Sequence, residues 1–177
     1  MARRIPDAEI VAVVSDLESA PGLARARERG LPAFSVPRGS SEGRAAHEAR
    51  ILQILDEARP DVVCLAGYMR VLSPEFVARY RGRILNIHPS LLPKYRGASP
   101  QKRALEAGEG VSGCTVHWVD EGTDTGPIVL QRTVPIEPGD TEETLSARIL
   151  SEEHAAYPAA IASVLERLGR VSDRGMP

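Results

Sequence analysis

Short, largely apolar runs alternate along this chain with segments of helical character, and this alternation restricts the folds that it can adopt. The runs at 10–14, 33–36, 62–66 and 84–87 are too short for helices and lack the regular polar face of a half-exposed strand. Such strands are typical of a parallel sheet that is buried on both faces. We therefore predict an α/β fold with a single doubly wound, mostly parallel sheet and helices on both faces, a Rossmann-like arrangement.

The pattern changes after residue 110. Residues 111–119 and 128–134 are rich in β-forming side chains and are joined by a glycine-containing segment, which predicts two antiparallel strands at one edge of the sheet. Residues 140–168 then show helical periodicity, which we expect Pro158 to interrupt. A chain of 177 residues can bury one core, so we predict a single domain over residues 1–177.

The composition excludes several classes of function. A net charge of −2 provides no basic field for nucleic acid, and no apolar run approaches the roughly 20 residues of a membrane span. The N-terminal residues carry charge without the apolar stretch of a secretory signal, so we expect a cytoplasmic protein with neither a nucleic-acid nor a membrane partner. Paired cysteines and His-x-x-x-His spacing are lacking, and we therefore predict no metal site.

The residues that most suggest chemistry are Asn86, His88 and Asp124. Asn86 and His88 lie two positions apart at the end of a predicted strand, so their side chains project to the same side. Asp124 lies on a later glycine-rich segment that can fold back over them. An amide donor, a titratable base and a carboxylate that orients the base are the groups needed for acyl transfer through a tetrahedral intermediate. By contrast, we expect His117 to be structural within its strand and His47 to lie on a solvated helix face.

Three segments resemble the folate-dependent formyltransferase family. They are Asp-Val-Val-Cys-Leu-Ala-Gly-Tyr-Met-Arg at 61–70, Asn-Ile-His-Pro-Ser-Leu-Leu-Pro at 86–93 and Glu-His-Ala-Ala-Tyr-Pro at 153–158, with Asp124 at a compatible spacing. The similarity is greatest to the phosphoribosylglycinamide formyltransferase branch. It implies that a formyl group passes from 10-formyltetrahydrofolate to the amine of glycinamide ribonucleotide, in purine biosynthesis. In this reaction His88 is expected to move the proton of the attacking amine to the departing folate nitrogen, Asn86 to donate to the formyl oxygen, and Asp124 to orient His88.

The resemblance also implies two binding regions. The folate is expected at residues that flank the catalytic strand and the later loop, namely Met69, Arg70, Val71, Leu72, Val77, Ile84, Val119, Asp120, Glu121, Gly122 and Thr123. Core packing is an equally open interpretation for the apolar members of this set. Glu153 is expected to bind the ribose hydroxyls of the amine substrate. Arg44 is expected near the substrate phosphate, although a solvated arginine on a helix surface is the alternative.

One part of the family pattern has no counterpart here. Family members begin with a strand and a loop rich in Gly, Ser and Asn, whose N–H groups hold the substrate phosphate. Residues 1–9 contain no glycine and no apolar strand, and the run at 10–14 resembles the second strand of the family. We therefore predict an N-terminally shortened chain in which the first, central strand is missing. The position between 10–14 and 62–66 is then empty, repaired or filled by a borrowed strand.

Other functions remain open at this point. Methionyl-tRNA formyltransferase shares an element like residues 95–98, but its nucleic-acid-binding domain has no counterpart in the sequence. Formyltetrahydrofolate hydrolase would carry an N-terminal regulatory domain, which is also lacking. A third hypothesis is a folate-binding remnant with little activity, which the missing loop favours and the intact polar residues disfavour. Association into a homo-oligomer is compatible with the sequence.

Overall fold

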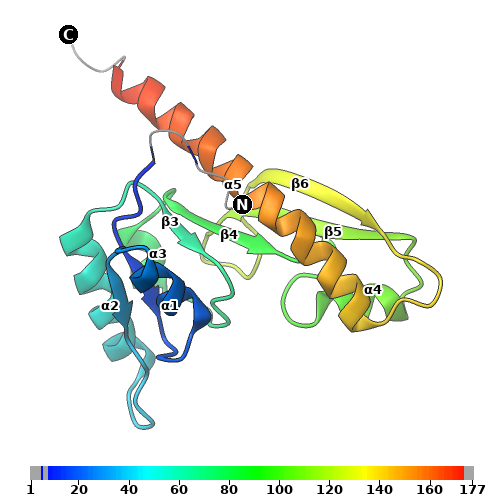
Figure 1. The fold of residues 1–177 in the computed structure, drawn as a ribbon, viewed down its shortest axis with the longest axis horizontal. Helices are drawn as coiled ribbons and strands as arrows, with labels where there is room; N and C mark the ends of the chain where they lie inside the picture. Colours follow the sequence, from blue (N-terminus) through cyan, green and yellow to red (C-terminus); the bar gives the residue numbers. More distant parts are fainter. Residues whose placement is uncertain (1–4, 6–7, 174–177) are drawn as a thin grey trace.

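The computed structural model describes residue 5 and residues 8–173, which form alternating strands and helices (Figure 1). The strands are β1 (Val13–Ser15), β2 (Ala33–Ser35), β3 (Val63–Leu65), β4 (Ile84–His88), β5 (Val111–Trp118) and β6 (Ile128–Pro135). The helices are α1 (Pro21–Glu28), α2 (Arg44–Ala58), α3 (Pro74–Arg79), α4 (Pro100–Glu106) and α5 (Glu142–Asp173). This order confirms the predicted alternation of strands and helices. Two predictions extend to residues that the structure does not describe. One is a single domain over residues 1–177, and the other is the lack of a phosphate loop in residues 1–9. Both stay predictions.

The described strands pair in two sheets. β1 is parallel to β2, and β3 is parallel to β4. β5 is antiparallel to both β4 and β6, which confirms the predicted antiparallel edge. Among the described residues, no strand pairs with the second edge of β1 or of β3, so the expected single sheet is divided there. The division lies where the sequence predicts that a central strand is missing.

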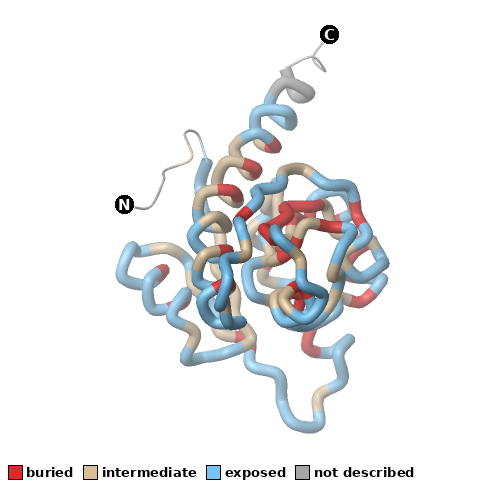
Figure 2. The backbone as a smooth tube through the Cα atoms, turned by 90° about the vertical axis from the view of Figure 1, so that its right-hand side faces the viewer, coloured by how far each residue is buried: buried red, intermediate tan, exposed pale blue. Residues whose placement is uncertain are grey.

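α5 is the longest element, and it crosses one face of β5 and β6 (Figure 1). Leu145, Ile149 and Val164 are at most 1% exposed and belong to one core with Leu85 of β4. Figure 2 shows such buried positions recurring at intervals along this helix. Burial of each large side chain contributes about 1.5–3 kcal/mol, which together exceeds the cost of about 3 kcal/mol for a proline inside a helix. The helix therefore continues through Pro158, and the predicted interruption is wrong.

A second core lies between α2, α3 and the parallel strands. Ile51 and Leu55 of α2 pack with Phe76 of α3 and with Ile84 of β4. His47 is spaced by four positions from Ile51 and therefore lies on the same buried face of the helix. It is 1% exposed, and its Nε2 lies 2.7 Å from a backbone carbonyl oxygen, so the expectation that it is solvated is wrong.

Two further observations concern residues 5 and 8–173 alone. None of their helices combines the length and the apolar character that crossing a bilayer requires. In the same part of the chain, no group of three or more His, Cys, Asp or Glu side chains is arranged to hold a metal ion.

Candidate functional site

β4 presents two of the polar residues singled out by the sequence. Asn86 and His88 lie two positions apart on this strand, and their side chains therefore share one face of the sheet. The antiparallel neighbour β5 places His117 opposite Asn86 and Thr115 opposite His88. His88 and His117 are only 7% and 2% exposed, so the protein shields these imidazoles from most of the solvent.

Asp124 reaches this pair from the loop that joins β5 to β6. Its backbone φ is 53°, a left-handed conformation that Asp adopts more readily than most residues. Its Oδ2 accepts a hydrogen bond from Gly97 N at 2.8 Å and lies 3.4 Å from His88 Nδ1. Its Oδ1 lies 3.5 Å from His117 Nε2. The structure thus brings Asp124 to His88 directly, and to Asn86 through His117.

The contacts of His88 define which ring nitrogen can exchange a proton. Nε2 lies 3.0 Å from the carbonyl oxygen of Tyr95, and because that oxygen can only accept, Nε2 carries a hydrogen. Nδ1 is left facing the carboxylate of Asp124. In the neutral ring Nδ1 can therefore accept a proton. In the charged ring both nitrogens have an acceptor, and the carboxylate offsets the new charge.

The carboxyl of Asp124 is suited to this task because it stays ionised at neutral pH. Burial acts to raise its pKa, but the contact with His117, the hydrogen bond from Gly97 N and the nearby His88 together outweigh burial. The pKa of Asp124 is consequently below its ordinary value of 3.8.

The segment that follows β4 is held by side chains of the two antiparallel strands. Thr115 Oγ1 donates to the carbonyl oxygen of Ser90 at 2.7 Å and accepts from Leu92 N at 3.1 Å. Gln131 Nε2 donates to Thr115 Oγ1 at 2.8 Å and to the carbonyl oxygen of Leu92 at 2.9 Å. The same segment carries Tyr95, so these bonds also hold the carbonyl group that orients the imidazole of the site.

The structure places His117, which sequence reasoning treats as structural, within the site. Its Nδ1 lies 2.8 Å from the carbonyl oxygen of Trp118, and its Nε2 lies 3.3 Å from Asn86 Nδ2. Nothing in the local sequence signals this role, because only the register between β4 and β5 brings the two side chains together.

An open hollow of about 310 Å³ adjoins the end of β5, where the chain leads into the Asp124 loop. Its lining includes Val77, Val119 and Asp120, which the sequence predicted for the folate, and Arg81, Gly82, Trp118 and Pro127, which it did not. Ile84, also predicted for the folate, is completely buried in the second core. Core packing is therefore what the contacts of Ile84 show, and its predicted place at the folate stays a prediction.

The remaining loop residues predicted for the folate lie beside this hollow. Glu121 forms an ion pair with Arg81, with an oxygen to nitrogen distance of 2.6 Å. Gly122 N donates to an Asp120 side-chain oxygen at 3.0 Å, and Thr123 is exposed. Since Arg81 and Asp120 line the hollow, the exposed turn of the loop lies next to it.

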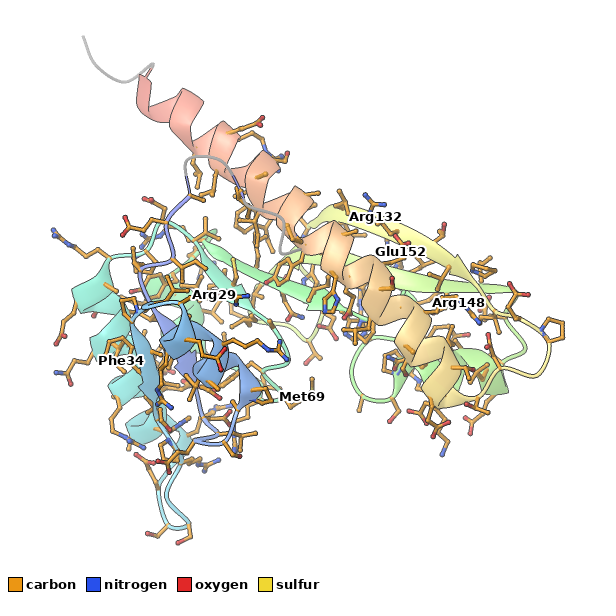
Figure 3. All side chains as sticks on the ribbon, in the orientation of Figure 1. Arg29, Phe34, Met69, Arg132, Arg148 and Glu152 are labelled. Carbon is orange, nitrogen blue, oxygen red and sulfur yellow. The ribbon has the colours of Figure 1, made fainter. Side chains whose placement is uncertain are left out.

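The segment after β3 carries the other residues predicted for the folate. Met69 and Val71 are 90% and 59% exposed, and Figure 3 shows Met69 projecting away from the sheets. Leu72 is partly buried against the second core. Arg70 Nε donates to Asp16 Oδ2 at 2.8 Å, and this bond joins the segments that follow β3 and β1. Exposed apolar side chains next to a polar site are a common mark of a ligand surface.

The two residues predicted for the amine substrate have different surroundings. Glu153 is half-buried on α5, and burial raises the pKa of its carboxyl. Arg44 is the exposed first residue of α2. Among the described residues, no hydrogen bond or ion pair joins Arg44 to His88 or Asp124. The predicted position of Arg44 near the substrate phosphate stays a prediction.

Comparison with known proteins places this geometry in a family. The family model described as formyl transferase matches residues 2–161. Phosphoribosylglycinamide formyltransferase of Escherichia coli (strain K12) is 45% identical over 150 residues, which cover 85% of this chain and 71% of that protein. The trifunctional purine biosynthetic protein adenosine-3 of Drosophila melanogaster is 48% identical over 165 residues, or 93% of this chain. This chain spans only 12% of the length of that relative.

A solved structure gives the same result. The crystal structure of phosphoribosylglycinamide formyltransferase from Brucella melitensis has a TM-score of 0.83 to this fold at 52% sequence identity. The match covers 88% of this chain and 80% of that one. The family resemblance of the sequence motifs is therefore confirmed, and the chain belongs to the formyl transferase family.

Proposed function

We propose that this chain transfers the formyl group of 10-formyltetrahydrofolate to the amine of glycinamide ribonucleotide. The observation that carries the proposal is the convergence of Asn86, His88 and Asp124, because these residues supply the donor, the base and the carboxylate of an acyl transfer. The choice of substrates is supported by the relatives, two of which are phosphoribosylglycinamide formyltransferases. The Drosophila relative is a purine biosynthetic protein.

In the proposed reaction the amine nitrogen attacks the formyl carbon, and negative charge develops on the formyl oxygen. Asn86 donates an N–H to that oxygen, and one such preorganised donor can lower the barrier by about 3–4 kcal/mol. Nδ1 of His88 takes the proton that the amine loses, while Asp124 offsets the charge. The proton then passes to the folate nitrogen as the bond from that nitrogen to the formyl carbon breaks, which restores the neutral imidazole.

We assign the folate to the hollow beside the Asp124 loop and to the exposed segment after β3. Val77 and Val119 provide apolar contacts there, and Met69 and Val71 offer exposed apolar surface. Glu153 is assigned to the ribose hydroxyls of the amine substrate, since its half-buried carboxyl can accept hydrogen bonds from them. With Glu153 at its ribose, the amine substrate would extend from the catalytic residues toward α5.

Steady-state turnover with both substrates tests the proposal. We expect His88→Ala and Asn86→Ala to lower kcat by orders of magnitude. Lys102→Ala, an exposed change on α4, is the control and should leave kcat unchanged. An active His88→Ala variant at saturating substrates would refute the assignment of the base. A wild-type chain that binds a folate analogue in calorimetry but not the amine substrate would favour the folate-binding remnant instead.

We also propose that the reaction needs no metal, because the acid–base and carboxamide groups account for the chemistry and the sequence lacks the usual spacing of metal ligands. The test is activity after treatment with a chelator. Activity that is lost on chelation and restored by one divalent ion would contradict this proposal.

A further inference from the structure

We infer that His117 is a positioning residue that fixes the orientation of the Asn86 carboxamide. His117 is only 2% exposed, it contacts two groups of the site, and the reaction described above does not use it. The inference rests on the proposed function, in which Asn86 donates to the formyl oxygen.

The ring of His117 has a defined tautomer. Its Nδ1 lies 2.8 Å from the carbonyl oxygen of Trp118, which can only accept, so Nδ1 carries a hydrogen. In the neutral ring Nε2 is consequently an acceptor. Asn86 Nδ2 lies 3.3 Å from Nε2 and donates to it. A carboxamide turned the other way would direct Oδ1 at the same lone pair, and this orientation is therefore disfavoured.

The selected orientation has a consequence for the reaction. One N–H of the Asn86 amide is held by His117, and the second N–H remains to donate to the formyl oxygen. Without His117 the carboxamide can rotate between two orientations, only one of which presents the donor correctly. The loss appears mainly in the transition state, where charge develops on the oxygen, rather than in the binding of either substrate.

A second neighbour of His117 has to be distinguished from the first. Asp124 Oδ1 lies 3.5 Å from the same Nε2. At 3.5 Å this contact is long for a hydrogen bond, and Nε2 donates to the carboxylate only in the charged ring, in which both nitrogens carry a hydrogen. The contact with Asn86 is shorter, and strand pairing sets it, because the two residues are directly opposite in the register of β4 and β5. We therefore assign the effect to Asn86.

Three substitutions at position 117 test the inference. His117→Leu removes both ring nitrogens, His117→Asn retains a polar atom near the position of Nδ1, and His117→Gln retains one near the position of Nε2. We expect the Leu and Asn variants to lower kcat about tenfold with little change in KM, a fraction of the effect of losing a donor entirely. The Gln variant should retain most of the wild-type kcat. Rescue by Asn rather than Gln would overturn the inference, since it would show that the bond to Trp118 is what matters.

A matched control and a double-mutant cycle complete the experiment. His47→Leu removes another buried histidine that bonds to a backbone carbonyl oxygen, and it should lower stability without changing kcat per folded molecule. His117→Leu should have no further effect on kcat in an Asn86→Ala background but should retain its effect in an Asp124→Asn background. The opposite pattern, or an unchanged kcat in His117→Leu, would overturn the inference. If the Leu variant does not fold, the comparison of the Gln and Asn variants tests the inference. A wild-type chain that does not transfer the formyl group would refute the proposed function rather than the role of His117.

Discussion

Replacing Thr115 by Val is expected to destabilise the segment after β4, which carries Tyr95, the residue whose carbonyl oxygen orients His88. Val has nearly the same shape as Thr but lacks the hydroxyl, which here makes three hydrogen bonds in a position that is completely buried. The carbonyl oxygen of Ser90 and the N–H of Leu92 would lose this partner. Each buried polar group that is left unpaired costs about 1–3 kcal/mol, so we expect a loss of about 2–4 kcal/mol from a typical total of about 5–15 kcal/mol.

Urea unfolding can measure this loss, because the chain contains a single tryptophan, Trp118, next to the site. With a dependence of about 2 kcal/mol per molar urea, the expected loss moves the midpoint of unfolding by about 1–2 M. The control is Thr133→Val, the same substitution at an exposed position of the neighbouring strand β6, which should change stability by less than about 0.5 kcal/mol. Turnover of the folded Thr115→Val variant should also fall, because Tyr95 is then held less firmly.

Equal midpoints for Thr115→Val, Thr133→Val and the wild type would refute this reasoning. That result would mean that water or a shift of the backbone satisfies the carbonyl and N–H groups at no cost. A loss of stability without any loss of turnover would refute only the second step, in which the hydrogen bonds of Thr115 hold the carbonyl group that orients His88.

Three other predictions concern charge and the edges of the sheets. Asp124→Asn should lower kcat about a hundredfold or more at every pH from 5 to 8, since the pKa of Asp124 is lowered by its contacts and the carboxylate is ionised throughout that range; initial rates check this. Arg148, the Glu137 N–H and Thr144 hold the pKa of Asp140 well below its ordinary value of 3.8. The ionised carboxylate of Asp140 therefore stabilises the fold fully above the pKa that this group has in the unfolded chain, and this stabilisation is lost as the pH falls toward its pKa in the folded chain. Asp140→Asn should accordingly lower the free energy of unfolding, measured in urea, at pH 7, and it should lower it progressively less below about pH 4. Within the described residues β1 and β3 each have one unpaired edge, and these edges should cause the protein to associate at high concentration. A molar mass from light scattering that stays at the monomer value at every concentration would contradict this.

Those parts of the fold that depend on local pattern could be predicted from the sequence. Short apolar runs and the change to β-rich segments were sufficient for the α/β alternation and the antiparallel edge, because each signal lies within a few residues. The interruption at Pro158 was wrong because burial against the sheet outweighs a local penalty. His47 was placed in solvent because its polarity suggested an outer face, whereas its spacing from Ile51 puts it inside.

The site shows the same division between local and distant information. Asn86 and His88 were predictable because their spacing on one strand directs both side chains to one face. Ile84, on the same strand, is predicted for the folate, and in the structure its side chain packs in the core. Whether an apolar residue lines a pocket or fills a core depends on which helix covers it, and the chain must be folded before that is known.

His117 is the residue that local information was least able to identify. A strand exposes alternate residues on opposite faces, so a shift of one residue in the pairing of β4 with β5 would move His117 to the other face of the sheet and away from Asn86. The register that prevents this shift is maintained in part by backbone bonds beyond the catalytic residues, including the bond from Val119 N to the carbonyl oxygen of Ile84 at 2.9 Å. The completely buried Ile84 therefore helps to position the amide donor through its backbone. In this fold the strand pairing and the orientation of the site residues are consequences of the same contacts, so residues of the core belong in any account of how the site works.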